Sequence, residues 1–180
     1  MRNLWKSLLG LWVIGMWLGV SAPAQADSVG PYYATPSWDQ TLPVATRFIV
    51  LSNFNSGAVL DRNTGLVWEK SPSTASTAWN GARSTCINKN VGGQRGFRLP
   101  SIVELNSLVD PSVAFPGPTL PPGHPFLNVP AENYWSATTS AASPTLAWGV
   151  GFGQGDVFDN DKAFDFHVWC VRGGMNADQY

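Results

Sequence analysis

A proline-rich segment between residues 111 and 130 limits the folds open to this chain more than any other feature. The segment contains seven prolines and two glycines. Because each proline removes a backbone donor and fixes φ, regular helices and strands are excluded here, and a long surface loop is predicted. Phe115, Leu120, Phe126 and Leu127 would pin this loop to the body of the domain. Loops of this length often carry function, so the loop either shapes a binding surface or only connects two parts of the fold.

The residues before the loop predict a strand, a hairpin and two helices. A β run over 48–51 precedes a hairpin in which 58–60 and 66–68 flank a turn-forming sequence at 61–65. A first helix is expected between Ser73 and Asn88, because apolar residues recur there at helical spacing: Ala75, Ala78, Trp79, Ala82 and Cys86. A short strand over 97–99 should follow.

The second helix is predicted to begin after Pro100, where Ser101 and Glu104 have the spacing of a capping box. Its buried stripe would contain Ile102, Leu105 and either Leu108 or Val109. Beyond the loop the pattern is β. Bulky residues alternate with alanine and glycine over 146–153, a strand follows at 155–158, and the last strand is expected at 167–172. The whole pattern predicts one α+β domain, with two helices packed on a small antiparallel sheet and long irregular loops.

The first 26 residues are typical of a signal peptide. Arg2 and Lys6 precede an apolar stretch from Leu8 to Val20, and Ala24-Gln25-Ala26 fits a cleavage site. The alternative is a membrane anchor, but the apolar stretch is short of the roughly 20 residues that span a bilayer. We therefore expect export to the periplasm or the extracellular space. The remaining boundaries are predicted as an extended lead-in at 27–46, a domain at 47–174 and a tail at 175–180.

Charge and cysteine content narrow the partners and the compartment. Cleavage removes two of the 11 basic residues, so the mature chain carries 9 against 12 acidic residues. This balance argues against indiscriminate binding to nucleic acid or to sulfated polymers. The even cysteine count in an exported chain predicts one disulfide, Cys86–Cys170, and the alternative is two inert buried thiols.

Three separated segments carry a family resemblance: Gly96-Phe97-Arg98-Leu99-Pro100-Ser101 leading into Val103-Glu104-Leu105, then Tyr134-Trp135-Ser136-Ala137-Thr138, then Val168-Trp169-Cys170-Val171-Arg172-Gly173. Together they resemble the Lcl C-terminal domain family, named for the end domain of the Legionella collagen-like adhesin, over about 58–173. The resemblance implies a C-type-lectin-like fold and a surface module that supports adhesion, reported as a trimer that binds sulfated polysaccharides. It also implies the same cysteine pair.

Ring-bearing residues are the first candidates for a glycan site, since a ring face can stack on a sugar. Trp68, Trp79, Trp135 and Trp148 have core patterns, whereas Trp38 and Trp169 are less determined. Trp169 would bind ligand if it lay on an outer sheet face near His167, and His124 and Phe126 would contribute from the proline-rich loop. The alternative for each ring is a packed structural position.

Charged residues suggest two further features. Asp156, Asp159, Asp161 and Asp165 could together hold calcium, although the spacing lacks the calcium-loop pattern and a solvated acidic turn is the alternative. Arg98 and Arg172 stand alone in apolar strands and are expected to need carboxylate partners, with Glu104 or the acidic turn supplying them.

The motifs of common enzymes are absent from the sequence. No serine lies in a Gly-x-Ser-x-Gly turn, no His-Glu-x-x-His occurs, and a disulfide would remove both thiols from catalysis. The sequence therefore predicts a non-catalytic recognition or adhesion domain without an obligatory cofactor, with a surface or extracellular glycan as its partner and homo-oligomers possible in principle. The alternative is a structural envelope or surface-assembly subunit that binds protein.

Overall fold

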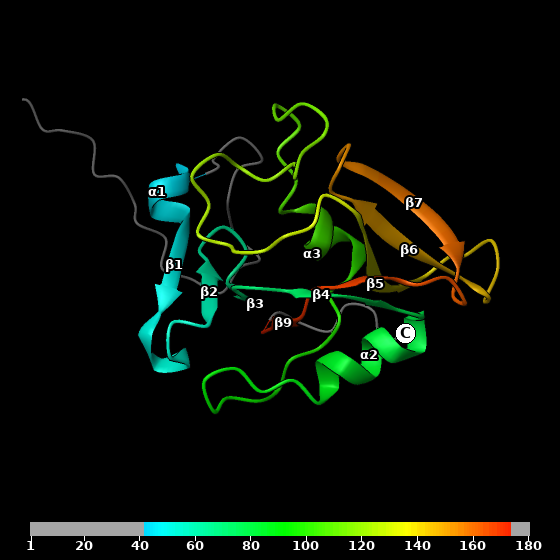
Figure 1. The fold of residues 1–180 in the computed structure, drawn as a ribbon, viewed down its shortest axis with the longest axis horizontal. Helices are drawn as coiled ribbons and strands as arrows, with labels where there is room; N and C mark the ends of the chain where they lie inside the picture. Colours follow the sequence, from blue (N-terminus) through cyan, green and yellow to red (C-terminus); the bar gives the residue numbers. More distant parts are fainter. Residues whose placement is uncertain (1–41, 174–180) are drawn as a thin grey trace, which may run out of the picture. The chain divides into compact units, whose positions relative to one another are not determined.

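The hairpin around residues 61–65 lies at the centre of the first sheet. The computed structural model describes residues 42–173, in which β1 (Phe48–Leu51), β2 (Ala58–Asp61), β3 (Leu66–Glu69) and β9 (Val171–Arg172) pair in that order. All three pairings are antiparallel. Gly65 has φ 71° in the turn, a conformation that glycine adopts at little cost. The predicted β run and hairpin are confirmed (Figure 1).

The second sheet contains most of the C-terminal third. Its order is β4 (Ser73–Thr77), β8 (Phe166–Val168), β5 (Asn133–Thr139), β6 (Leu146–Gly151) and β7 (Asp156–Asp161). The β5–β8 contact is parallel and the other pairings are antiparallel. A Cβ at Gly149 would lie 2.7 Å from the Tyr134 carbonyl oxygen and 2.9 Å from the Phe158 ring, so the bare face of β6 admits a close neighbour. The α+β class is confirmed, but the prediction of one small sheet is wrong.

The helices are shorter than the sequence predicts. α2 (Trp79–Ile87) buries Trp79, Ala82 and Cys86 as expected, but it begins six residues after Ser73. The residues from Ser73 to Thr77 form β4 instead, because their hydroxyl and β-branched side chains favour a strand paired with β8. Residues 97–99 form no strand and contribute only an isolated bridge between Arg98 and Val171. Two further short helices are α1 (Val44–Arg47) and the 3₁₀ turn η1 (Ser52–Phe54).

The capping box of α3 (Ile102–Asn106) is confirmed. Ser101 Oγ accepts a hydrogen bond from the Glu104 N–H at 3.2 Å, and Glu104 Oε2 accepts one from the Ser101 N–H at 2.9 Å. Leu105 and Leu108 are fully buried, while Ile102 and Val109 are partly buried against the same core.

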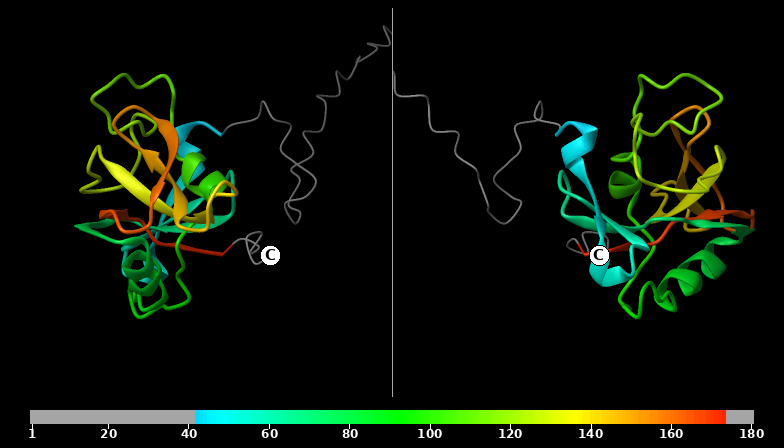
Figure 2. Two further views of the ribbon diagram at one scale, coloured as in Figure 1. Left: turned by 90° about the vertical axis from the view of Figure 1, so that its right-hand side faces the viewer. Right: turned by 60° about the vertical axis from the view of Figure 1, so that its left-hand side comes forward.

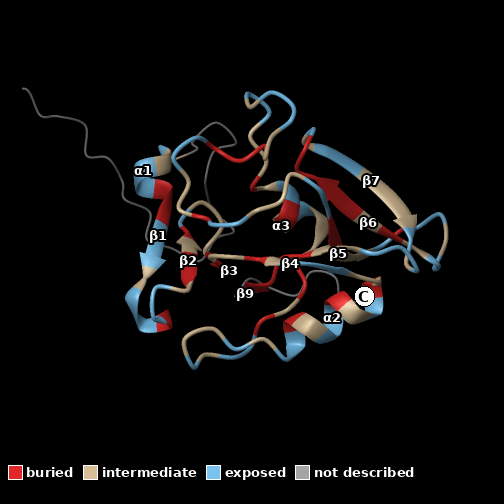
Figure 3. Cartoon of the chain, viewed as in Figure 1, coloured by how far each residue is buried: buried red, intermediate tan, exposed pale blue. Residues whose placement is uncertain are grey.

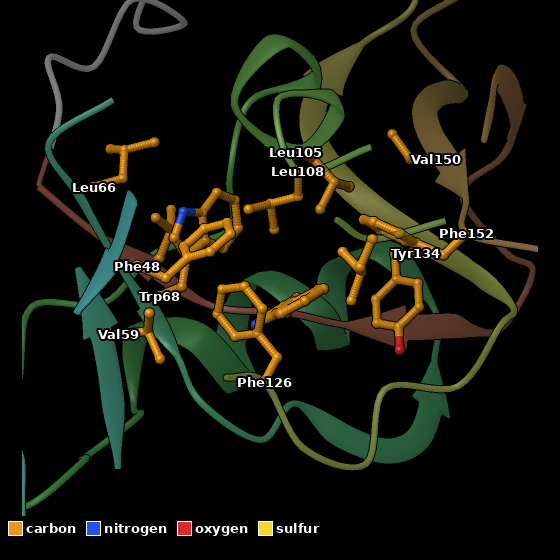
Figure 4. Packing of buried hydrophobic residues seen from close by; sticks show 13 residues of the cluster. Phe48, Val59, Leu66, Trp68, Leu105, Leu108, Phe126, Tyr134, Val150 and Phe152 are labelled. Atoms are coloured by element: carbon orange, nitrogen blue, oxygen red, sulfur yellow. The ribbon is translucent and has the colours of Figure 1, made fainter. Parts of the chain in front are cut away.

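The expected last strand is divided between the two sheets. Its alternation is as predicted: Trp169 and Val171 lie in one hydrophobic core, and Val168 and Cys170 lie in the other. Figure 4 shows the first core, in which rings from distant elements pack together. The division places β8 in the second sheet and β9 in the first, so the end of the chain links both sheets and both of its faces are covered.

The predicted disulfide is confirmed. Cys86 on α2 is bonded to Cys170 across 84 residues of sequence, and both residues are fully buried. Since the sequence has only these two cysteines, neither thiol is free. The bond attaches α2 to the segment that joins the two sheets.

The proline-rich segment contains no helix or strand between 111 and 130, as predicted. Leu120 and Phe126 anchor it with 2% and 4% exposure, but Phe115 and Leu127 are exposed, so the expectation that all four pin the loop is wrong. Thr119 donates its backbone N–H and its hydroxyl to the Phe152 carbonyl oxygen, at 2.7 and 3.1 Å. Figure 3 shows that much of this loop is exposed, whereas most of β6 is buried.

Several predicted segments lie outside the described residues. These are the signal peptide at 1–26, most of the lead-in at 27–46 and the tail at 175–180. Among residues 42–173, no helix has the length and apolar composition needed to cross a bilayer. The boundaries proposed for the domain at 47–174 stay a prediction.

Candidate ligand-binding groove

Trp169 does not lie on an outer face of the sheet. Its side chain is fully buried, and its Nε1–H donates to the Glu69 carbonyl oxygen at 2.8 Å. The ring is 4.9 Å from Phe126, 5.6 Å from Phe152 and 5.8 Å from Trp68, measured between ring centroids. The prediction of an outer ligand platform at Trp169 is wrong, because both faces of the last segment of the chain are covered.

Phe126 and His124 form an anchor rather than an exposed pair. The Phe126 ring is 4% exposed and packs edge-on against Phe48 at 5.2 Å. Its backbone N–H donates to His124 Nδ1 at 3.2 Å, which fixes the loop where Phe126 enters the core. Burial lowers the pKa of His124, so the neutral ring that accepts this bond is favoured.

His167 is half-buried on β8 beside Tyr134 of β5, with the ring centroids 5.3 Å apart. Within residues 42–173 its Nδ1 is buried without a hydrogen-bond partner. The structure therefore brings His124, Phe126, Trp169 and His167 together, with Tyr134 between the last two, as a line of ring contacts. The three central rings of that line, Phe126, Trp169 and Tyr134, are buried in the core and are closed to a sugar.

The remaining tryptophans mostly follow their patterns. Trp68, Trp79 and Trp135 are buried as predicted, and the Nε1–H groups of Trp79 and Trp135 donate to the carbonyl oxygens of Ser136 and Thr77. Trp148 is only half-buried, so its assignment to the core is wrong. Trp38 lies outside the described residues.

The four aspartates near β7 do not meet. Asp159 accepts a hydrogen bond from Ser140 Oγ at 2.7 Å, and Asp161 accepts one from the Ala163 N–H at 2.9 Å. Asp156 lies at the opposite end of β7 from Asp161, and Asp165 is exposed in the turn beyond it. In the part of the chain that the structure describes, no three His, Cys, Asp or Glu residues are grouped so that they could hold a metal ion. The predicted calcium cluster is therefore not formed by these residues.

One of the two predicted arginine ion pairs is confirmed. Arg98 donates two hydrogen bonds to the Glu104 carboxylate at 2.7 and 2.6 Å and a third to the Gly173 carbonyl oxygen, a structural role. Arg172 is not paired with a carboxylate within residues 42–173. Its guanidinium donates to Gln94 Oε1 at 3.3 Å and lies over the Phe54 ring, so the prediction for Arg172 is wrong.

Sequence reasoning missed a buried ion pair. Arg47 Nη2 is 2.7 Å from Asp61 Oδ2, and the Asp61 side chain is fully buried. Arg47 also donates to the Ser107 carbonyl oxygen at 2.8 Å, which connects the first hairpin to the end of α3. The sequence signal for this ion pair was Asp61, the acidic first residue of the turn at 61–65.

A groove of about 580 Å³ opens where the proline-rich loop passes the end of the second sheet. Its walls come from the loop, from the residues leading into β5 and from the β6–β7 turn: Phe115, Pro116, Ala131, Glu132, Asn133, Gly151, Gly153, Gln154 and Asp156. Figure 1 and Figure 2 show the loop beside this turn. We call this cavity the loop groove.

Glycines form the floor of the loop groove. Gly151 pairs with Asn133 of β5 on one side and with Asp156 of β7 on the other. A Cβ at Gly151 would collide with Asp156 Oδ1 and would lie 3.1 Å from Asn133 Oδ1. A Cβ at Gly153 would lie 2.9 Å from the Ala131 carbonyl oxygen. Because Gly151 has no side chain, Asn133 Oδ1 and Asp156 Oδ1 can both lie close to its Cα.

The polar side chains of the loop groove have no internal partners among the described residues. Glu132, Asn133, Gln154 and Asp156 are exposed, and their side chains take part in no hydrogen bond or ion pair there. Phe115, on the wall, is 71% exposed. Acceptor oxygens beside an open aromatic ring can bind a ligand that carries several hydroxyl or amino donors and an apolar face.

A second cavity of about 430 Å³ lies beside β3 and is lined in part by Glu69, Lys89 and Leu127. The Glu69 carboxylate receives a 2.8 Å hydrogen bond from Lys89 Nζ, so its polar groups already satisfy one another in part. Burial raises the pKa of Glu69, and Lys89 opposes that rise. The lining residues that the structure describes for this cavity include no aromatic ring, and the loop groove is the better candidate.

Two comparisons with known proteins bear on the chain as a whole. No curated protein matches it. The family model described as the Lcl C-terminal domain matches residues 57–172, from the first hairpin to the last strand. That range covers more than half of the chain and includes the disulfide, the second sheet, all of the first sheet except β1, and the loop groove. This chain therefore belongs to the Lcl C-terminal domain family.

Proposed function

We propose that this chain is an exported, non-catalytic recognition domain that binds a surface or extracellular glycan in the loop groove. The observation that carries the proposal is the combination of an exposed Phe115 ring with unpaired acceptor oxygens from three segments of the chain. Sugar-binding sites need this combination, because a pyranose has both an apolar face and a ring of hydroxyl donors. Membership of a family named for a surface adhesin is in keeping with adhesion.

Other features support the same proposal. A buried disulfide suits an oxidising compartment, either the periplasm or the extracellular space. The acidic balance of the mature chain disfavours nucleic acid as a partner. Two cysteines held in a disulfide supply no nucleophile, which favours a role without catalysis. The arrangement of short helices, two sheets and a long loop agrees with a C-type-lectin-like fold, which we propose on this ground and from the family resemblance.

A protein partner is the second candidate, and one observation favours it. β1 is the edge of the first sheet and exposes Ile49 and Val50 at 43% and 37%. An exposed apolar edge strand can pair with a strand of another chain, either an envelope protein or a second copy of this one. In that case the chain would be a structural subunit of the envelope or of a surface assembly.

Binding to an array of neutral, acidic and sulfated glycans tests the main proposal. The array should be run with calcium and with a chelator, using the wild type, Phe115→Ala and Phe164→Ala. Phe164 is a matched control, since it is 56% exposed but lies in the turn after β7, outside the loop groove. We expect Phe115→Ala to weaken binding roughly tenfold, the loss of about 1.4 kcal/mol of ring stacking, while Phe164→Ala binds normally.

Other outcomes would redirect the proposal. Equal binding by wild type and Phe115→Ala would move the site away from the loop groove. An array that stays silent under every condition would reject a glycan ligand, and co-purification of an envelope protein would then support the second candidate.

A further inference from the structure

The described walls of the loop groove are negatively charged. Among residues 42–173, the lining includes Glu132 and Asp156 and contains no lysine, arginine or histidine. The three ion pairs of residues 42–173 are Arg47–Asp61, Lys89–Glu69 and Arg98–Glu104, and none involves a carboxylate of the groove. Both charges are therefore available to a ligand.

The floor of the groove also needs hydrogen-bond donors. Asn133 Oδ1 and Asp156 Oδ1 are both acceptors, and both lean over Gly151. No N–H or O–H group of the described chain donates to either side chain. A ligand that donates to both oxygens would satisfy them, and an ammonium group, with three donors and a positive charge, does so best.

The same geometry is unfavourable for anions. A sulfate or a uronic acid carboxylate would place a like charge beside Glu132 and Asp156, and the side-chain donors that the described lining offers it are the neutral amide groups of Asn133 and Gln154. The groove therefore discriminates between glycans by charge as well as by shape.

We infer that the loop groove selects glycans with free amino groups, such as glucosamine polymers, over N-acetylated ones, and that it rejects sulfated polymers. This inference rests on the proposed glycan function and adds the class of sugar. The carboxylates would hold the ammonium group while the Phe115 ring stacks on the sugar face. Attraction at an exposed site is modest for each charge pair, so two pairs should give a preference of roughly threefold to tenfold.

Three hexasaccharides of similar length test the selectivity: β-1,4-linked glucosamine, β-1,4-linked N-acetylglucosamine and a heparin fragment. Calorimetry at one fixed pH and temperature measures the three affinities. We expect the glucosamine hexamer to bind tightest and the heparin fragment not to bind. The preference for glucosamine should shrink as salt is raised, since the charges are exposed to solvent.

Matched variants separate the charge from the rest of the site. Glu132→Gln combined with Asp156→Asn should abolish the preference for glucosamine, so that the glucosamine and N-acetylglucosamine hexamers bind with affinities within about twofold of each other. Asp165→Asn removes one exposed carboxylate outside the groove and should preserve the preference.

The failure of this inference differs from the failure of the proposed function. Equal binding of the two amino-sugar hexamers, tightest binding of heparin, or a preference that survives the double variant would overturn the charge selectivity while glycan binding stands. Absence of binding to all three sugars, together with a silent glycan array, would overturn both.

Discussion

Trp169→Ala removes a ring that contacts four other aromatic rings of the first core. The side chain is fully buried and contacts Trp68, Phe126, Tyr134 and Phe152. Truncating a buried aromatic residue costs about 3–5 kcal/mol. The lost Nε1–H also leaves the Glu69 carbonyl oxygen without that donor, which adds about 1–3 kcal/mol. Because ordinary domains are stable by about 5–15 kcal/mol, the variant should be close to unfolding or unfolded.

Urea unfolding followed by far-UV circular dichroism measures this loss directly. Trp169→Phe keeps a ring in the core and loses the hydrogen bond, so its cost should be about 1–3 kcal/mol. Trp148→Ala is the matched control, since the same truncation at a half-buried position should cost much less. A Trp169→Ala midpoint no lower than that of Trp148→Ala would refute the packing argument. Loss of glycan binding in Trp169→Ala would report unfolding and would not identify a site.

Three further predictions concern the ion pair, the loop anchor and the disulfide. Asp61→Ala leaves the buried guanidinium of Arg47 unpaired and should lower the free energy of unfolding by about 3–5 kcal/mol in denaturant titrations, with Glu104→Ala, at a more exposed pair, losing less. The pKa of His124 is lowered in the folded state, so its contribution to stability is present above about pH 6.5 and is lost as the pH falls. Urea midpoints at about pH 7.5 and 5 should therefore differ less in His124→Gln than in the wild type, and an unchanged difference would contradict the assignment. Replacing Cys86 and Cys170 with alanine opens a loop of 84 residues and should lower the free energy of unfolding by about 4 kcal/mol in urea titrations. A variant as stable as the oxidised wild type would contradict this role of the bond.

The sequence was sufficient to predict the elements that depend on interactions between residues close together in the chain. The capping box at Ser101 and the turn at 61–65 each involve residues within a few positions of one another, and both formed as predicted. The helix expected from Ser73 failed because its alanines have helical spacing, whereas pairing with β8, about ninety residues away, favours a strand. Helical periodicity cannot report such a distant partner.

Trp169 illustrates a second limit. Its alternation with Cys170 was predicted correctly, and alternation states which residues share a face. It does not state whether another element covers that face. Here the cover comes from residues such as Glu69, 100 positions earlier in the chain, and Phe126 in the loop.

The loop groove was predictable only in outline. The proline-rich loop and the bare face of the β6 segment were both visible in the sequence, and Asp156 was singled out for a different role. The convergence of Asn133 and Asp156 over Gly151 depends on the register of three strands, and two of those strands are separated from β5 by turns whose lengths set that register. A single sequence contains the residues of such a site without indicating that they meet.

The aromatic residues that stabilise the core of this domain are different from the aromatic residue that lines the loop groove. The rings with the most obvious affinity for sugars, including Trp169, Phe126 and Tyr134, form the centre of the core, where any change would be costly. The walls of the loop groove come instead from a loop and from turn residues such as Phe115, Glu132 and Gln154, which are exposed and whose side chains carry little of the packing. Substitutions at these positions can alter the ligand without disturbing the fold. Under the proposed function, we expect members of this family with the same core to differ in ligand according to the residues that line this groove, with ligand specificity following the charge at positions 132 and 156.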